Sequence, residues 1–266
     1  MPELPEVENI VLAMREKLIG KKLSQLNIRR ADIFEPSSGA VRKAILGKKL
    51  NSIHRHGKYM ILGFDDANLM IHLRMTGQLI LNSADTPDKH THALFDFDGN
   101  EVRYRDIRRF GRLTLVDHPE NPGAIKHIGP DMLKAGFADW SEKMSRRRIP
   151  AKAALLDQKI AAGIGNIYAD EALFLAKIHP LSKPCELTED QLRELFKRIK
   201  QVLRLAIKHG GTTFMDFRDF SGKPGNFRRK LRVFQRDGEP CRDCNSTLEK
   251  IKVGGRSTHF CSQCQK

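Results

Sequence analysis

Apolar residues in the first twenty positions recur at the spacing of a helix. Pro5 suits the first turn of a helix, and Gly20 suits its end. The apolar stripe consists of Val7, Ile10, Val11, Met14 and Leu18. We therefore expect a helix that begins almost at the first residue and ends near Gly20.

From about Lys22 to Val116 the pattern changes to short runs typical of strands. Asp98 and Gly99 form a two-residue hairpin signal between two of these runs. The clearest runs are residues 59–64, 69–73, 79–81 and 94–97. Several short strands joined by polar turns predict a β-sandwich with flanking helices.

The rest of the chain predicts a different architecture. Residues after Asp117 are rich in Pro, Gly and charge, which favours a linker at 134–150. Thr188 and Gln191 form a capping box before a helix that ends at Gly210. We expect an α+β protein of two domains. The first is a sandwich domain at 1–133, and the second is a helical domain at 151–231 that carries a zinc-binding hairpin at 232–266.

Four of the five cysteines share a spacing that indicates a zinc site. Two Cys-x2-Cys pairs are separated by sixteen residues, so two tight turns can direct four thiolates at one tetrahedral centre. The ligands would be Cys241, Cys244, Cys261 and Cys264. We expect one structural Zn²⁺; two disulfides are the alternative, which the lack of an export signal disfavours. Cys185 is interpreted as a plain thiol.

The charge balance points to a polyanionic partner. The chain has 47 Lys and Arg against 32 Asp and Glu, giving a net charge of +15 and a pI of about 9.8. Nucleic acid is favoured over a membrane because no basic amphipathic helix stands out, although a merely soluble basic surface stays possible. No apolar run is long enough to span a bilayer, and Glu3, Glu6 and Glu8 replace the positive charge of a signal peptide. We expect a cytosolic protein.

The N-terminus has the composition of a nucleophile beside two acids. Removal of Met1 would expose Pro2, whose secondary α-amine is less protonated at neutral pH than a lysine and can form an iminium with a carbonyl. Glu3 and Glu6 would supply acid and base. On composition alone, an ordinary acidic helix start is the stronger interpretation.

Motifs along the whole chain favour the nucleophile over the ordinary helix start. In order, they are MPELPEVE at 1–8, HGKY at 56–59, HLRMTG at 72–77, DIRRFG at 106–111, GIGNIYADE at 163–171 and the four-cysteine tail. The chain thereby resembles the formamidopyrimidine-DNA glycosylases, bacterial enzymes that remove oxidised purines such as 8-oxoguanine from duplex DNA. The resemblance implies base excision repair in the cytoplasm, at the nucleoid, by a monomer.

The resemblance also implies roles for particular residues. Pro2 would attack the sugar C1′ as Glu3 protonates the ring oxygen and Glu6 organises the site. Lys58 and Arg256 would hold phosphates and assist β- and δ-elimination. DNA contacts are implied for His90, Arg147, Lys152 and, in the turn of a helix-two-turn-helix motif, Asn166. Met75, Arg108 and Phe110 would fill the gap left by the extruded base.

Two other functions stay open from the sequence. The related endonuclease VIII enzymes act on oxidised pyrimidines, but they have Gly where this chain has Leu4. Residues 213–227 resemble the loop that covers a flipped purine, which favours purines. A zinc-ribbon DNA-binding protein without catalysis would share the charge and the cysteines, and only Pro2 with its acids separates it from an enzyme.

Overall fold

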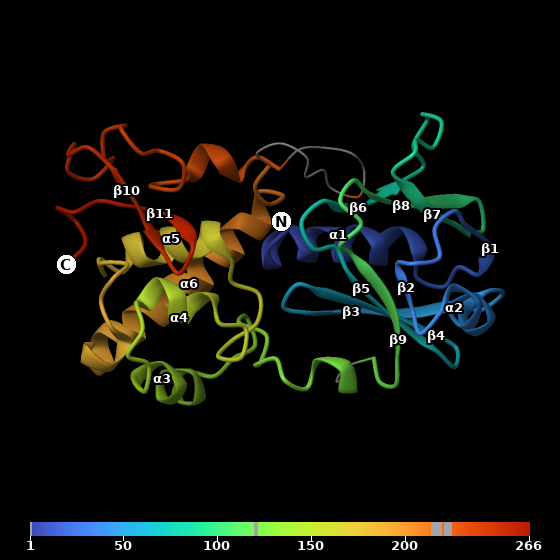
Figure 1. Ribbon diagram of the computed structural model, residues 1–266, viewed down its shortest axis with the longest axis horizontal. Helices are drawn as coiled ribbons and strands as arrows, with labels where there is room; N and C mark the ends of the chain where they lie inside the picture. The colour runs from blue at the N-terminus through green and yellow to red at the C-terminus, as the bar shows by residue number, and fades with distance from the viewer. Residues whose placement is uncertain (1, 120–121, 214–219, 221–224) are drawn as a thin grey trace. The chain divides into compact units, whose positions relative to one another are not determined.

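The computed structural model describes residues 2–119, 122–213, 220 and 225–266 (Figure 1). The chain forms two compact units, and each is built from two separate stretches. The first unit comprises Met1–His127 and His209–Arg228, and the second comprises Ile128–Lys208 and Arg229–Lys266. In the described part of the chain, no helix is long and apolar enough to cross a membrane.

The first unit is the predicted β-sandwich. Its helices and strands are α1 (Leu4–Leu18), β1 (Leu23–Ile28), β2 (Phe34–Glu35), α2 (Ser38–Ile45), β3 (Leu50–His56), β4 (Tyr59–Phe64), β5 (Asn68–His72), β6 (Gly77–Leu81), β7 (Thr91–Phe97), β8 (Asn100–Asp106), β9 (Arg112–Val116) and the 3₁₀ turn η1 (Gly123–Ile125). One sheet has the strand order β1-β7-β8-β6 and the other β2-β9-β5-β4-β3. Asp98 and Gly99 form the predicted hairpin turn, with φ values of +48° and +82°.

One apolar core joins α1 to both sheets. The predicted stripe of α1 is buried, and the helix packs along β3 and β4 (Figure 1). Phe220, far along the chain, is also fully buried in this core. The core therefore fixes both the N-terminus of α1 and a piece of the 209–228 stretch in the same unit.

The second unit is helical and ends in a two-stranded hairpin. Its elements are α3 (Phe137–Ser145), α4 (Ala151–Leu156), α5 (Asn166–Leu175), η2 (Pro184–Glu186), α6 (Glu189–Lys208), β10 (Glu249–Val253) and β11 (Arg256–Phe260), while η3 (Phe227–Lys230) lies where the two units join along the chain. Thr188 and Gln191 form the predicted capping box of α6, with hydrogen bonds of 2.9 and 3.2 Å. Phe174 of α5 packs into a small core with two of the four clustered cysteines, Cys241 and Cys261.

The domain boundaries differ from those expected. The predicted linker at 134–150 contains α3, because Trp140 and Met144 are apolar at helical spacing and both are buried. The 209–228 stretch belongs to the first unit, although we had assigned it to the helical domain. The stretch groups with the first unit because residues such as Phe220 pack into the core of that unit, far from their place in the sequence.

Candidate active site

The N-terminus of α1 brings together the residues assigned to nucleophilic attack. Glu3 and Glu6 form a reciprocal capping box, in which Glu6 Oε2 accepts the backbone N–H of Glu3 at 2.8 Å. Their relative exposures are 3% and 2%, and Pro2 is buried beside them. The first unit thus holds Pro2 next to two carboxylates in fixed positions.

The second oxygen of Glu6 is held by a distant part of the chain. Thr212 donates its backbone N–H to Glu6 Oε1 at 2.7 Å. Gly211 has a φ of +79°, and a Cβ at this position would lie only 2.9 Å from the same oxygen. The sequence indicated Gly211 only as a helix stop, because no local pattern links it to Glu6.

Lys58 lies in the turn between β3 and β4 and is 8% exposed. The preceding Gly57 has a φ of +57°, which permits the tight turn. Arg55 braces this turn by donating to the carbonyl of Gly57 at 3.1 Å and by pairing with Glu8 of α1. The ammonium of Lys58 is therefore carried by a rigid turn tied to the helix that bears Glu3 and Glu6.

His72 is a charge-sensitive neighbour of Lys58. It faces Tyr59 across the β4–β5 pair, with ring centroids 4.4 Å apart. Burial, followed by the positive charges of Arg74 and Lys58, lowers the pKa of His72 from 6.5 to about 3. His72 is thus neutral at physiological pH, and its Nδ1 accepts the backbone N–H of Arg74 at 3.1 Å.

The three residues assigned to gap filling lie on two short loops. Met75 and Phe110 are 38% and 50% exposed. The guanidinium of Arg108 lies over the Phe110 ring, 4.6 Å from its centroid. The sequence-based expectation that these side chains point outward is confirmed.

Asp106, which the sequence analysis did not single out, joins these loops. Its fully buried carboxylate accepts the hydroxyl of Thr76, beside Met75, and the backbone N–H of Gly111 at 2.9 Å. Its own backbone N–H donates to the carbonyl of half-buried His90 at 3.0 Å. The carboxylate of Asp106 therefore sets the spacing of the gap-filling loops, and its backbone N–H holds the His90 turn.

In the second unit, Asn166 and the Arg256 hairpin lie together. Asn166 begins α5 and donates from Nδ2 to the carbonyl of Ser257 at 2.9 Å. Arg256 itself is exposed at the start of β11, next to the tip formed by Gly254 and Gly255. Two predicted phosphate-binding residues are thus neighbours, although 90 positions separate them in sequence.

The structure does not support Lys152 as a phosphate-binding residue. Its side chain is completely buried, where it pairs with Asp170 and donates to the carbonyl of Asn166 at 2.7 Å. The sequence cannot reveal this, because Asp170 lies in another helix. Arg147 is partly exposed, and its guanidinium pairs with Asp157 at 3.1 Å.

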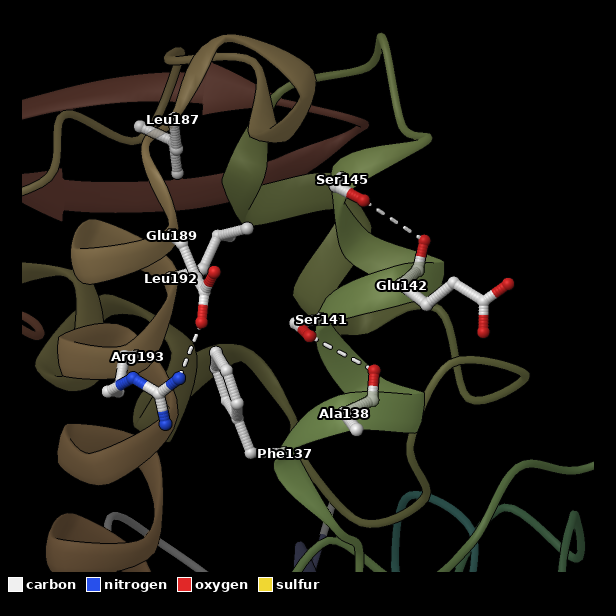
Figure 2. Close-up of a pocket in the computed structure, with 9 residues that line it drawn as sticks. All are labelled: Phe137, Ala138, Ser141, Glu142, Ser145, Leu187, Glu189, Leu192 and Arg193. Carbon is white, nitrogen blue, oxygen red and sulfur yellow. Dashed lines mark hydrogen bonds and ion pairs between the residues drawn. The ribbon is translucent and has the colours of Figure 1, made fainter.

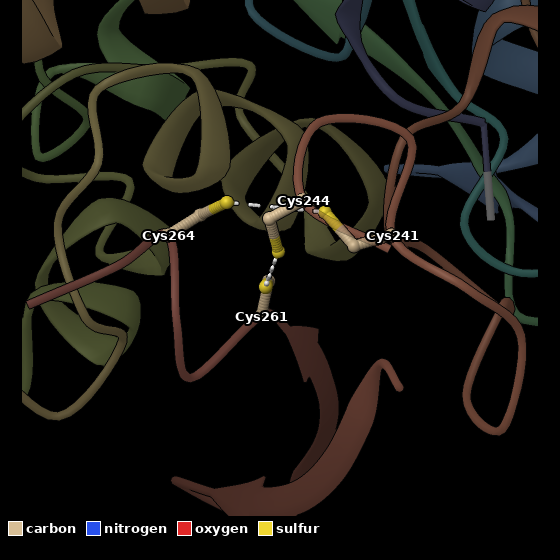
Figure 3. A group of neighbouring side chains, drawn as sticks. All are labelled: Cys241, Cys244, Cys261 and Cys264. Atoms are coloured by element: carbon tan, nitrogen blue, oxygen red, sulfur yellow. Dashed lines mark hydrogen bonds between the residues drawn. The ribbon is translucent and has the colours of Figure 1, made fainter. Parts of the chain in front are cut away.

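The four predicted zinc ligands converge (Figure 3). All four sulfur atoms lie within 4.8 Å of one another, and the Cys241–Cys264 and Cys244–Cys261 pairs are 3.9 and 3.5 Å apart. These separations match tetrahedral zinc, whose Zn–S bonds of ~2.3 Å place sulfurs roughly 3.8 Å apart. A hydrogen bond from Ser246, the largest cause, lowers the pKa of Cys244 to about 6, which favours the thiolate that a metal needs. All the cysteines are thiols, so the disulfide alternative is wrong.

A cavity of about 500 Å³ lies elsewhere, between α3 and α6 (Figure 2). Arg193 lies over the Phe137 ring at 4.1 Å and pairs with Glu189. Ser141 and Ser145 donate to carbonyls of their own helix. The polar groups on its wall are satisfied locally, and none of the predicted site residues lines it, so it has no link to the chemistry above.

Family models match the chain in three consecutive parts. The formamidopyrimidine-DNA glycosylase N-terminal domain matches residues 1–113, its H2TH domain matches 128–218, and the zinc finger found in FPG and IleRS matches 238–266. The formamidopyrimidine-DNA glycosylase of Desulforamulus reducens is 43% identical over 100% of this chain and 99% of its own.

Solved structures agree with these models. The MutM (Fpg) protein of Thermus thermophilus is 35% identical, with a TM-score of 0.88, over 99% of this chain and 98% of that one. A Lactococcus lactis Fpg mutant in complex with Fapy-dG DNA is 34% identical, with a TM-score of 0.91, over the full length of both chains. This chain belongs to the formamidopyrimidine-DNA glycosylase family.

Proposed function

We propose that this protein removes formamidopyrimidines and 8-oxoguanine from duplex DNA and then cleaves the strand at the abasic site, acting at the nucleoid. Family membership supports a DNA glycosylase, and the related Lactococcus structure holds Fapy-dG DNA. The observation that carries the mechanism is the buried group of Pro2, Glu3 and Glu6.

In the proposed first step, the secondary amine of Pro2 attacks C1′ of the damaged nucleoside. Glu3 gives a proton to the ring oxygen as the C1′–O4′ bond breaks, and the proton of the attacking amine leaves with the base when the C1′–N bond breaks. The product is an iminium between Pro2 and C1′. Glu6 positions this group, because both of its oxygens are held by backbone N–H groups.

Strand cleavage follows from the iminium. Its electron demand acidifies the C2′ proton, whose loss expels the 3′ phosphate, and a second elimination expels the 5′ phosphate. We assign the phosphate contacts to Lys58 and Arg256. The braced turn that carries Lys58 and the exposed hairpin position of Arg256 both support these assignments.

Extrusion of the base requires the resulting gap to be filled. Met75, Arg108 and Phe110 are suited to this because two loops hold them outward and Asp106 fixes those loops. The preference for purines rests on the resemblance around Leu4 and residues 213–227. Most of that loop, residues 214–219 and 221–224, lies outside the described residues.

The test is borohydride trapping on DNA containing 8-oxoguanine opposite cytosine. Pro2→Gly should lose most of the crosslink yet keep duplex affinity, since phosphate contacts supply most of it. Glu3→Gln should bind but lose at least ~10²-fold in base excision, and it should retain more crosslinking than Pro2→Gly on a preformed abasic site.

Pro5→Ala is the matched control, because Pro5 lies in the same buried segment without a free amine. Crosslinking by Pro2→Gly at the wild-type rate would reject the proposed nucleophile and direct attention to Lys58.

A further inference from the structure

The backbone of the hairpin that carries Arg256 is held against α5 at two points. Asn166 Nδ2 bonds the carbonyl of Ser257 at 2.9 Å, and Asp170 Oδ2 accepts the backbone N–H of His259 at 3.0 Å. The Arg256 side chain is exposed, so only its backbone is restrained in this way.

The second of these points is a buried polar network. Asp170 uses one oxygen for the ammonium of Lys152 and the other for His259, whose Nδ1 lies 3.2 Å away as well. The relative exposures of these side chains are 0%, 0% and 2%. The His259 ring packs edge-on against Phe234 with centroids 5.0 Å apart. The imidazole therefore has one defined orientation.

The same network also contacts the backbone of Asn166, the other proposed DNA-binding residue of this unit. Lys152 donates to the carbonyl of Asn166 at the start of α5, and the neighbouring Ala153 lies against the hairpin tip, where a Cβ on Gly254 would be 3.6 Å from the Ala153 Cβ. One chain of contacts thus runs from Asn166 through Lys152, Asp170 and His259 to β11.

Burying such a network is a costly way to gain stability. A buried ion pair contributes little net free energy compared with well-packed apolar residues, because both charges lose their hydration. Its directional bonds, in contrast, fix the relative placement of the groups that they join. Placement is what a phosphate grip requires, since a misplacement of ~1 Å can cost on the order of 10²-fold in rate.

We propose that Asp170 and His259 are positioning residues for strand cleavage, which hold β11 on α5 so that Arg256 keeps a fixed distance from Asn166. The inference rests on the proposed role of Arg256. It predicts that weakening the Asp170–His259 contact slows elimination without weakening duplex binding or removing zinc.

The variants separate geometry from stability. His259→Gln removes the donor at the Nδ1 position, whereas His259→Asn places an amide N–H close to it and should rescue. Asp170→Asn removes the charge but keeps the shape. Lys252→Gln is the control, because Lys252 lies on β10 of the same hairpin, opposite Ser257, and its side chain is exposed.

The measurement is the single-turnover rate of strand cleavage on a preformed abasic duplex, with zinc content and duplex affinity determined on the same samples. We expect a loss on the order of tenfold for His259→Gln and Asp170→Asn, and near wild-type rates for His259→Asn and Lys252→Gln. Borohydride crosslinking, which reports Pro2, should stay unchanged.

The same substitutions are then made in an Arg256→Ala background. If His259 acts through Arg256, His259→Gln should cause no further loss there. An equal loss in both backgrounds, equal rates for the Gln and Asn variants, or zinc loss from both His259→Gln and Asp170→Asn would overturn the inference. If Arg256→Ala alone cleaved at the normal rate, both the proposed role of Arg256 and the inference would be rejected. If Arg256→Ala were impaired but His259→Gln cleaved normally, only the inference would be rejected.

Discussion

Glu6 has both of its oxygens occupied by backbone N–H groups, and the residue beside the second one has no room for a side chain. The acid is therefore held from two directions, by its own helix and by residues 211–212. A side chain added at Gly211 should therefore displace the carboxylate of Glu6 while leaving its chemical identity unchanged.

Gly211→Ala should slow base excision on the order of tenfold, because its Cβ would lie 2.9 Å from Glu6 Oε1. Gly210→Ala is the control: its φ of +76° imposes a similar backbone strain, but its nearest neighbour is Gly225 Cα at 3.6 Å. Single-turnover excision assays compare the two. Equal losses would attribute the effect to strain alone.

His72 predicts an acid-sensitive stability. Its pKa is about 3 in the folded protein against an ordinary 6.5, so the unfolded chain binds an additional proton between these values, and the free energy of unfolding falls as the pH drops from 6.5 towards 3. His72→Asn should reduce that slope by up to ~1.4 kcal/mol per pH unit. Urea unfolding between pH 7 and pH 4, with exposed His127→Asn as the control, checks this. Parallel slopes for His72→Asn and wild type would contradict it.

At the scale of elements, the sequence predicts those helices, caps and turns that depend on residues close together in the chain. The stripe of α1, the Thr188 capping box and the Asp98–Gly99 turn depend on neighbours within a few residues, and all three are confirmed. The helix α3 was missed because the Pro, Gly and charged residues around it dominate the composition of that stretch.

The exposed loop 107–110 allows a matched comparison. Phe110→Ala should slow excision of 8-oxoguanine from duplex DNA, because the gap left by the base is then poorly filled and unstacking costs a few kcal/mol. Ile107→Ala is the control, since Ile107 is 43% exposed in the same loop and has no assigned role. Cleavage of a preformed abasic site should be affected less. An equal effect on both substrates would argue against gap filling.

At the scale of the whole molecule, the sequence indicates candidate site residues but not their surroundings. Pro2, Glu3, Glu6 and the four cysteines fall where expected, since each set is defined by short spacings. The sequence does not indicate the burial of Lys152, because its partner Asp170 lies in another helix. The two-piece units cannot be predicted from the sequence, because they depend on contacts between distant stretches.

The net charge of +15 predicts a steep salt dependence of duplex binding. Each neutralised phosphate contributes roughly −0.9 to the slope of log K against log salt. Arg256→Glu should therefore flatten the slope by about one contact, whereas Lys17→Glu on α1, which changes the net charge equally, should leave it nearly unchanged. Titrations between low and moderate salt measure both slopes. Equal flattening would mean that only the total charge matters.

The hydrogen bond between Glu6 and Thr212 joins residues 206 positions apart, which has a consequence for synthesis on the ribosome. At ~5–20 residues per second, roughly 10–40 s pass between the emergence of Glu6 and that of its partner. During this interval the nascent chain carries the proposed nucleophile and acids without the segment that holds Glu6. Phe220, which completes the core of the same unit, emerges later still. The proposed ring-opening step therefore has to wait for the emergence of residues 211–220.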